Sequence, residues 1–263
     1  MSRHSKWSKV KQFKGAVDAK RSASFTKLAR EITVAARETR HKLASGEQIG
    51  GPATMPSALG GKADLGMNVR LKVAMERARK ASMPKDAIER AITRGAGTGQ
   101  DATAIESLTY EAYAPGGMAL VIECLTDNRN RSANNVKHIL SEHTAALASP
   151  GSVTYLFERK GVVRIPGGLP ADRREETELA LIDAGAEDIE DAEDATEVRG
   201  TLSDLAKLAE TASELGLSVE SAEFEWVPKN LVETDEATGI KVAELIEELE
   251  ALDDVSHVYS NLA

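Results

Sequence analysis

The sequence of 263 residues contains very little cysteine, few aromatic residues and no long apolar run. Its single cysteine, Cys124, can form neither an internal disulfide nor a thiolate cage for zinc, which excludes disulfide scaffolds and zinc fingers. The longest apolar stretch in the middle of the chain, Met118 to Ile122, is far shorter than the roughly 20 residues of a membrane-spanning helix. The N-terminus is polar and basic, without an apolar signal segment. We therefore expect a cytoplasmic protein of two or three domains.

Charge is distributed very unevenly along the chain. Residues 1–95 contain 21 basic and 8 acidic residues, a balance of +13, and the remaining 168 contain 12 and 34, a balance of −22. A small domain of such positive charge is typical of a protein that binds a polyanion, most commonly nucleic acid. The alternative is that the basic domain docks on the acidic domains of its own chain. Only 4% of the residues are aromatic, too few for a sheet that stacks on successive bases, so we expect contact through phosphates and shape.

The first 95 residues predict a basic arm and three helices. Residues 1–21 are strongly basic and poor in apolar residues, and a helix with one apolar and one cationic face begins at Ser24. The stretch 43–66 is rich in Gly, Pro and Ser and predicts a loop. A second helix follows Asn68, and a third begins near Pro84 and stops at Gly95.

The rest of the chain predicts an α+β fold. Strands at 108–113 and 119–126 flank the turn Pro115-Gly116-Gly117, and a helix at 131–143 precedes a strand at 153–157. From Lys160 the order is β-α-β-β-α-β, which is the ferredoxin-like signature. Because the helix at 242–252 and the strand at 257–259 have no local partner, we expect them to complete the interrupted 108–157 segment. The predicted domains are therefore 1–97, then 98–158 with 229–263, and an inserted 159–228.

Four runs of sequence resemble the YebC/PmpR family, whose members also include mitochondrial translational activators. They are His4-Ser5-Lys6-Trp7 with Asp18-Ala19-Lys20-Arg21, Met83-Pro84 through Glu89-Arg90-Ala91-Ile92, Tyr110-Glu111 through Pro115-Gly116-Gly117, and Glu123 through Arg131. The resemblance implies an N-terminal helical domain followed by two α+β domains. It also implies a regulatory protein, either a DNA-binding transcriptional regulator or a factor acting on the ribosome.

The chain departs from this family pattern in three places. Ala112 and Ala114 stand where the family usually has glycines, and Thr144-Ala145-Ala146 replaces a usual Gly-Gly-Asn. The loop at 43–66 is longer than usual.

The candidate nucleic-acid contacts are basic residues, because Lys and Arg neutralise phosphates and release condensed counterions. They are Lys6, Lys9, Lys11, Lys14, Lys20, Arg21, Lys27, Arg30, Arg70, Lys72, Arg129 and Arg131. For the last two an alternative stays open: Asn128 or Asn130 caps the following helix, and the arginines pair with nearby carboxylates. Trp7 is expected to pack in the helical core rather than to stack on a base.

Signals for catalysis, metals and cofactors are weak. Cys124 lies in an apolar strand, which favours a core position. His138 and His143 are five residues apart, not the four that place two metal ligands on one helical face. The Gly95–Gly99 stretch lacks the lysine of a phosphate-binding loop, and acidic runs such as 187–194 are more often solvated turns than metal sites. We therefore expect no enzyme, no cofactor and no metal, but nucleic acid as partner, with a protein partner possible on the acidic domains.

Overall fold

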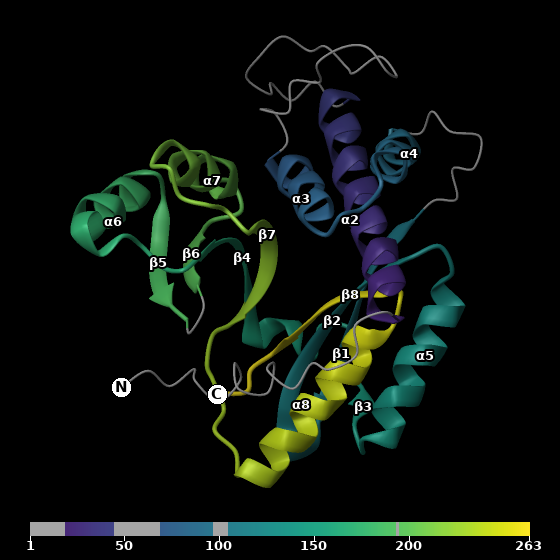
Figure 1. Ribbon diagram of the computed structural model, residues 1–263. Coiled ribbons are helices and arrows are strands. Elements are labelled where there is room, and N and C mark those ends of the chain that lie inside the picture. The colour runs from purple at the N-terminus through teal and green to yellow at the C-terminus, as the bar shows by residue number, and fades with distance from the viewer. Residues whose placement is uncertain (1–18, 45–68, 97–104, 193–194) are drawn as a thin grey trace. The chain divides into compact units, whose positions relative to one another are not determined.

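The computed structural model describes residues 19–44, 69–96, 105–192 and 195–263 (Figure 1). The α-helices are α2 (Ala19–Ala44), α3 (Val69–Lys80), α4 (Lys85–Gly95), α5 (Arg129–Glu142), α6 (Arg174–Asp183), α7 (Leu205–Glu214) and α8 (Glu236–Ala251). The strands are β1 (Glu106–Ala114), β2 (Met118–Thr126), β3 (Ala146–Leu147), β4 (Phe157–Pro166), β5 (Ala186–Asp191), β6 (Ala195–Gly200), β7 (Ser221–Pro228) and β8 (Val255–Ser260). Among the described residues, no helix has the length and apolar character needed to cross a membrane.

The chain divides into two compact units. The first unit contains the described residues within 1–23, 104–160 and 225–263, and the second contains those within 24–103 and 161–224. Strands β4 and β7 each begin in one unit and end in the other. The predicted three-domain boundaries stay a prediction.

The first unit contains a four-stranded antiparallel sheet in the order β3-β1-β2-β8. β1 and β2 form a hairpin whose turn is the predicted Pro115-Gly116-Gly117. Both glycines of this turn have a positive φ, 77° and 76°, which glycine tolerates without steric cost. β8 pairs with β2 from Leu120 to Cys124. This confirms the prediction that the C-terminal strand completes the interrupted segment.

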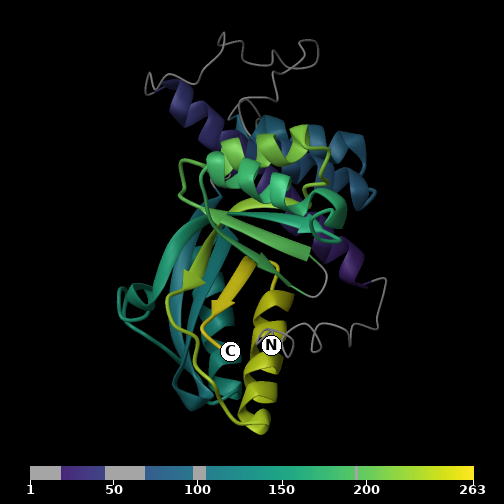
Figure 2. The same cartoon turned by 90° about the vertical axis from the view of Figure 1, so that its left-hand side faces the viewer.

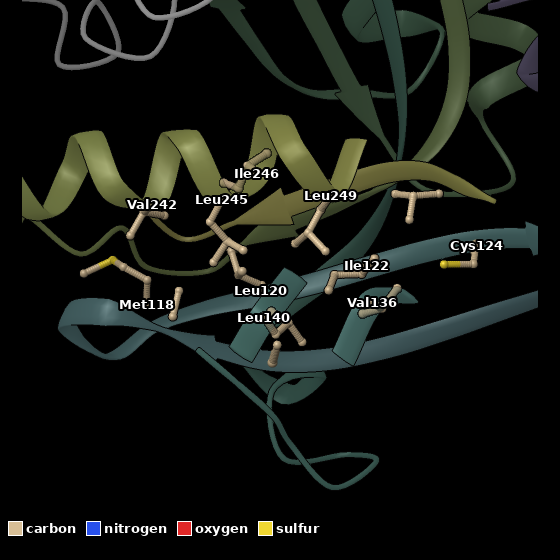
Figure 3. Close-up of a cluster of buried hydrophobic side chains, with 13 residues drawn as sticks. Met118, Leu120, Ile122, Cys124, Val136, Leu140, Val242, Leu245, Ile246 and Leu249 are labelled. Atoms are coloured by element: carbon tan, nitrogen blue, oxygen red, sulfur yellow. The ribbon is translucent and has the colours of Figure 1, made fainter. Parts of the chain in front are cut away.

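Helices α5 and α8 pack on one face of this sheet. Figure 3 shows side chains of α8 directed towards β2, with those of α5 in the same cluster. The labelled residues of the cluster are Met118, Leu120, Ile122, Cys124, Val136, Leu140, Val242, Leu245, Ile246 and Leu249. Alternate residues of β2, Ala119 and Val121, pack on the other face against Val153 and Phe157. β2 is therefore buried on both faces, as its unbroken apolar sequence requires.

The strand predicted at 153–157 is wrong. Thr154–Leu156 forms a 3₁₀ turn, and the short β3 at Ala146–Leu147 takes the edge position beside β1. The reason is the buried carboxylate of Glu111. It accepts hydrogen bonds from the backbone N–H groups of Gly151 (2.6 Å), Val153 (2.6 Å) and Thr154 (2.9 Å), so these groups are not available to a strand ladder.

The second unit contains the predicted ferredoxin-like domain. Its elements follow the order β4-α6-β5-β6-α7-β7, and the sheet order is β5-β6-β4-β7. α6 and α7 cover one face of this sheet (Figure 2), and their side chains share a core with Val163, Ile165 and Val198 of the strands. The fold is therefore α+β with two separate four-stranded antiparallel sheets, as predicted. The first unit has the same layering, although its chain order is β-β-α-β-α-β.

The second unit also contains the helical domain, formed by α2, α3 and α4. Its core includes Leu28 and Ile32 of α2, Met75 of α3 and Ile88 of α4. α4 ends at Gly95, as predicted, although Gly95 does not adopt the left-handed conformation that is common at helix ends. It is buried in the last turn, where an added Cβ would lie 2.2 Å from the Thr33 carbonyl oxygen. Gly95 is therefore needed for the close approach of α4 to α2.

Candidate nucleic-acid interface

The basic residues of α3 lie on two different faces. Arg70 and Arg77, seven residues apart, face β7 of the ferredoxin-like domain. The Arg70 guanidinium lies 4.8 Å from the centre of the Phe224 ring, and Arg77 forms ion pairs with Glu223 and, at 3.4 Å, with Glu31 of α2. Burial alone would lower the pKa of Arg77, but the neighbouring carboxylates outweigh it and raise this pKa above its ordinary value. These two arginines therefore join the helical domain to the sheet.

The other basic residues of α3 face solvent. Lys72, Arg79 and Lys80 are exposed, and within the described parts of the chain none of them has a carboxylate partner. Three side chains on one helix face can therefore approach the phosphates of a polyanion without first breaking an ion pair.

Helix α4 adds further cations. Arg90 and Arg94 lie one helical turn apart and are exposed. Like Lys72, Arg79 and Lys80 of α3, they have no carboxylate partner among the residues that the structure describes. Lys85 pairs only loosely with Glu89, at 3.6 Å with 88% of the lysine side chain exposed. Such an exposed pair contributes at most about 1 kcal/mol, so Lys85 can exchange its carboxylate for a phosphate.

The predicted contacts of α2 and the arm are only partly described. Lys27 and Arg30 are partly buried on α2, and each already takes part in an interaction within the structure. Lys20 and Arg21 belong to the first turn of α2. Lys6, Lys9, Lys11, Lys14 and Trp7 lie outside the described residues. Their role in nucleic-acid contact stays a prediction.

Arg131 is held in the structure by carboxylates. Its guanidinium donates two hydrogen bonds to Asp254, at 3.0 and 2.8 Å, and one to Asp127 at 2.7 Å. These hydrogen bonds raise the pKa of Arg131 above its ordinary value. Asn128 caps α5 by accepting a hydrogen bond from the Arg131 backbone N–H at 3.0 Å. The contacts of Arg131 therefore match the alternative reading of this run, a helix cap with paired arginines.

Arg129 is held less firmly. It pairs with Glu106 at 3.4 Å, and 68% of its side chain is exposed. We therefore keep Arg129, but not Arg131, among the residues able to reach a phosphate.

Arg79, Lys80, Arg90 and Arg94 are not among the contacts predicted from the sequence. One signal could have found them: Arg79 and Lys80 end a helix, and Arg90 and Arg94 are spaced to share one face. Conversely, the helical period alone could not reveal that Arg70 meets an aromatic ring from a strand more than 150 residues later.

The described residues whose side chains could in principle act in catalysis or bind a metal lie in the core or form ion pairs. Cys124 is fully buried in the core of the first unit. His143 pairs with Glu248 of α8 at 3.0 Å, and Asp188 and Glu190 pair with Arg199. Among the described residues, no group of three or more His, Cys, Asp or Glu is arranged so that it could hold a metal ion.

Taken together, the fold and its exposed cations define a multidomain α+β protein with a basic helical domain followed by two sheet domains. The chain belongs to the TACO1/YebC family. The model of the TACO1/YebC N-terminal domain matches residues 5–45 and 54–98, and that of the second and third domains matches 105–262. The interruption at 46–53 falls within the loop that the sequence showed to be longer than usual.

The relatives match over almost the whole chain. A probable transcriptional regulatory protein of Rubrobacter xylanophilus is 44% identical over 99% of this chain and 95% of its own length. One of Roseiflexus castenholzii is 42% identical over 100% and 95%. A crystal structure of a conserved hypothetical protein from Aquifex aeolicus has a TM-score of 0.75 and 38% identity, over 95% of this chain and 93% of that one. The relatives of Rubrobacter xylanophilus and Roseiflexus castenholzii are thus both named as probable transcriptional regulatory proteins, in agreement with the expected regulatory role.

Proposed function

We propose that this protein is a cytoplasmic transcriptional regulator that binds duplex DNA through the exposed cations of its helical domain, without catalysing a reaction. The observation that carries the proposal is the set of exposed basic side chains on α3 and α4 that have no carboxylate partner among the described residues. They are Lys72, Arg79, Lys80, Arg90 and Arg94. The basic arm, with Lys20, Arg21, Lys27 and Arg30 of α2, extends this surface in the proposal.

Binding of this kind gains affinity from the phosphates. Each lysine or arginine that neutralises a phosphate releases a condensed counterion, so affinity falls as salt rises. These contacts fix the position of the protein on the duplex but do not read its sequence. The acidic domains repel phosphates and would direct the duplex mainly to the helical domain. They are also the surface that we propose for a protein partner.

The test is a triple charge reversal on α3, K72E/R79E/K80E, measured with a 20-base-pair DNA duplex by fluorescence anisotropy over a range of salt concentrations. We expect a large loss of affinity and a slope of log K against log salt that is shallower by about 3, because about 0.9 counterion is released per phosphate contact. The matched control is K207E/K229E/K241E, which makes the same charge change at three exposed lysines outside the helical domain. Equal loss in both variants would show that only net charge matters and would refute the proposed interface.

A second candidate function is binding of structured RNA during translation. A cationic helix face accepts an A-form backbone as well as a B-form one, so α3 and α4 do not distinguish the two. The same anisotropy measurement with an RNA duplex of matched sequence separates the candidates.

A further inference from the structure

Helix α6 of the ferredoxin-like domain exposes two large apolar side chains. Leu179 is 63% exposed and Ile182 is 54% exposed. They are three residues apart, so they are neighbours on one side of the helix. The side of α6 that packs on the sheet carries other residues, the buried Thr177 and Leu181. Leu179 and Ile182 therefore lie on the outer side of α6, which we call the α6 face.

Helix α7, which covers the same sheet and shares its core, shows that such exposure is not needed for this fold. The exposed residues of α7 are small, polar or charged: Ala206, Lys207, Glu210, Ser213 and Glu214. α7 thus has the ordinary pattern of a surface helix, with its large apolar side chains turned to the core, whereas α6 does not. Neighbouring exposed apolar side chains with a polar rim are typical of a protein interaction site.

The rim of the α6 face is acidic. On a helix, the neighbours of a residue lie three and four positions away, so Leu179 is surrounded by Glu175, Glu176 and Asp183 in addition to Ile182. These three residues are exposed, and within the described structure their carboxylates form no ion pair. Lys207 of α7 lies nearby, but its amino group donates to the main-chain carbonyl of Asp183, at 2.8 Å.

The wider surroundings are negative as well. Residues 171–192, which contain α6 and the edge strand β5, include 9 acidic and 2 basic residues, a balance of −7. Both basic residues are already engaged. Arg174 pairs with Glu178 at 2.6 Å and with Asp191 at 2.7 Å, and Arg173 donates to the Leu215 carbonyl at 2.9 Å. The α6 face therefore lies in a negative field that nearby cations do not cancel.

This charge restricts what can cover the α6 face. Nucleic acid and anionic lipid headgroups would be repelled, and a second copy of the chain that presented its own α6 face would bring like charges together. An occupant must offer apolar side chains to Leu179 and Ile182 and cations to the carboxylates around them. An amphipathic helix with a leucine-rich stripe bordered by lysine or arginine offers both, and two helices pack well along such stripes.

We infer that the α6 face, formed by Leu179 and Ile182 with Glu175, Glu176 and Asp183, docks a basic amphipathic helix of a partner protein. The inference rests on the proposed function only in that a protein partner binds the acidic domains. It assigns that partner a site on one helix and a chemistry. It does not depend on DNA binding by the helical domain.

The experiment uses the full-length protein and a fluorescein-labelled peptide of about 18 residues, in which leucines recur at helical spacing and lysines fill the remaining positions. Fluorescence anisotropy measures its affinity. A peptide of the same composition, rearranged so that leucines form no stripe, controls for charge alone. The apolar variant is L179A/I182A, in which alanine keeps the helix because it is the best helix former. Its matched control is L231A/V232A, which truncates two exposed apolar residues of the first unit.

A second variant, E175Q/E176Q/D183N, tests the carboxylates. Its matched control is E233Q/E244Q/E247Q, which removes three exposed negative charges from the first unit. Because exposed charges are screened by salt, the wild-type affinity for the peptide should fall as salt rises, and the affinity of E175Q/E176Q/D183N should fall less steeply.

We expect L179A/I182A and E175Q/E176Q/D183N each to weaken binding of the leucine–lysine peptide by about tenfold, and both control variants to change it by less than about twofold. Unchanged affinity in L179A/I182A, an equal loss in L231A/V232A, or equal binding of the rearranged peptide would overturn the inference. So would sedimentation showing a wild-type dimer that L179A/I182A dissociates, since a second copy would then occupy the face. Binding of the 20-base-pair DNA duplex should be the same in L179A/I182A as in the wild type, so the DNA-binding proposal, tested by K72E/R79E/K80E, stands or fails separately.

Discussion

The buried carboxylate of Glu111 provides the sharpest test of the fold of the first unit. Its side chain accepts three backbone hydrogen bonds, from Gly151, Val153 and Thr154, and a longer one of 3.4 Å from the Thr154 hydroxyl. In E111Q one acceptor oxygen becomes an NH₂ group that faces N–H donors, so at least one buried donor loses its partner. Hydrogen bonds to a charged group contribute about 1.5–3 kcal/mol each, so we expect E111Q to lower the unfolding free energy by about 2–4 kcal/mol at pH 7.

The effect should depend on pH with a defined sign. Burial would raise the pKa of Glu111, but the backbone donors outweigh it and hold this pKa below the ordinary value of 4.5. Because the pKa of Glu111 is lower in the folded than in the unfolded state, its ionised carboxylate contributes its full stabilisation at pH values above the unfolded-state pKa. This stabilisation is lost as the pH falls through the folded-state pKa. The difference between wild type and E111Q should therefore narrow below about pH 4.5. Urea unfolding followed by circular dichroism at several pH values measures this difference in unfolding free energy.

The control for this prediction is Glu106, on the same strand. It is half exposed and pairs with Arg129 at 3.4 Å, so E106Q should change stability by less than about 1 kcal/mol. A loss in E111Q no larger than that in E106Q, or one that is constant from pH 7 to pH 3.5, would refute the role assigned to the Glu111 carboxylate.

Two further predictions concern backbone positions, and thermal and urea unfolding checks both. G95A should destabilise the protein by about 2–3 kcal/mol, because the new Cβ would lie 2.2 Å from the Thr33 carbonyl oxygen. G239A is the control and should stabilise the protein by about 0.5–1 kcal/mol, because its new Cβ would have no atom of another residue nearer than 3.6 Å. A G95A variant that is more stable than G239A would contradict the packing of α4 on α2. T144G should stabilise the protein by about 0.5–1 kcal/mol, because Thr144 directly follows the C-cap of α5 with a φ of 57°, which glycine adopts more easily. S141G, inside the same helix, is the control and should destabilise the protein by about 0.5 kcal/mol. A T144G variant that is less stable than the wild type would disprove strain at this position.

Regular elements with a clear period could be predicted from the sequence. The β-α-β-β-α-β order and the pairing of the C-terminal strand with the 108–157 segment are both confirmed. α8, however, begins at Glu236, six residues before the predicted start at 242. Residues 236–239 of its first turn include no large apolar side chain, so they show no apolar period. The start of α8 is marked instead by Asp235, which accepts a hydrogen bond from the Thr238 N–H at 3.0 Å.

Features that depend on distant parts of the chain could not be predicted. The strand expected at 153–157 has an apolar pattern, but the Glu111 carboxylate, more than 40 residues earlier, takes its N–H groups. Gly95 has the sequence position of a helix stop, and only the approach of α2 reveals that it is a packing residue. The partners of the α3 cations could not be predicted for the same reason. Helical spacing alone places Arg70, Lys72, Arg77 and Lys80 together on the non-apolar side, whereas in the structure Arg70 and Arg77 contact β7.

The basic residues of α3 lie on two faces, and this arrangement tests the alternative in which the basic domain only docks on the acidic domains of its own chain. That alternative holds for Arg77, whose charge is matched by Glu31 and by Glu223 of β7. It does not extend to Lys72, Arg79 and Lys80, for which the described residues supply no carboxylate. A helix that served only as an internal ion-pair partner would have no use for cations on its opposite face. The described cations of α3 therefore form two groups, one that joins the helical domain to the ferredoxin-like sheet and one that, in the proposed function, contacts the phosphates of a polyanion.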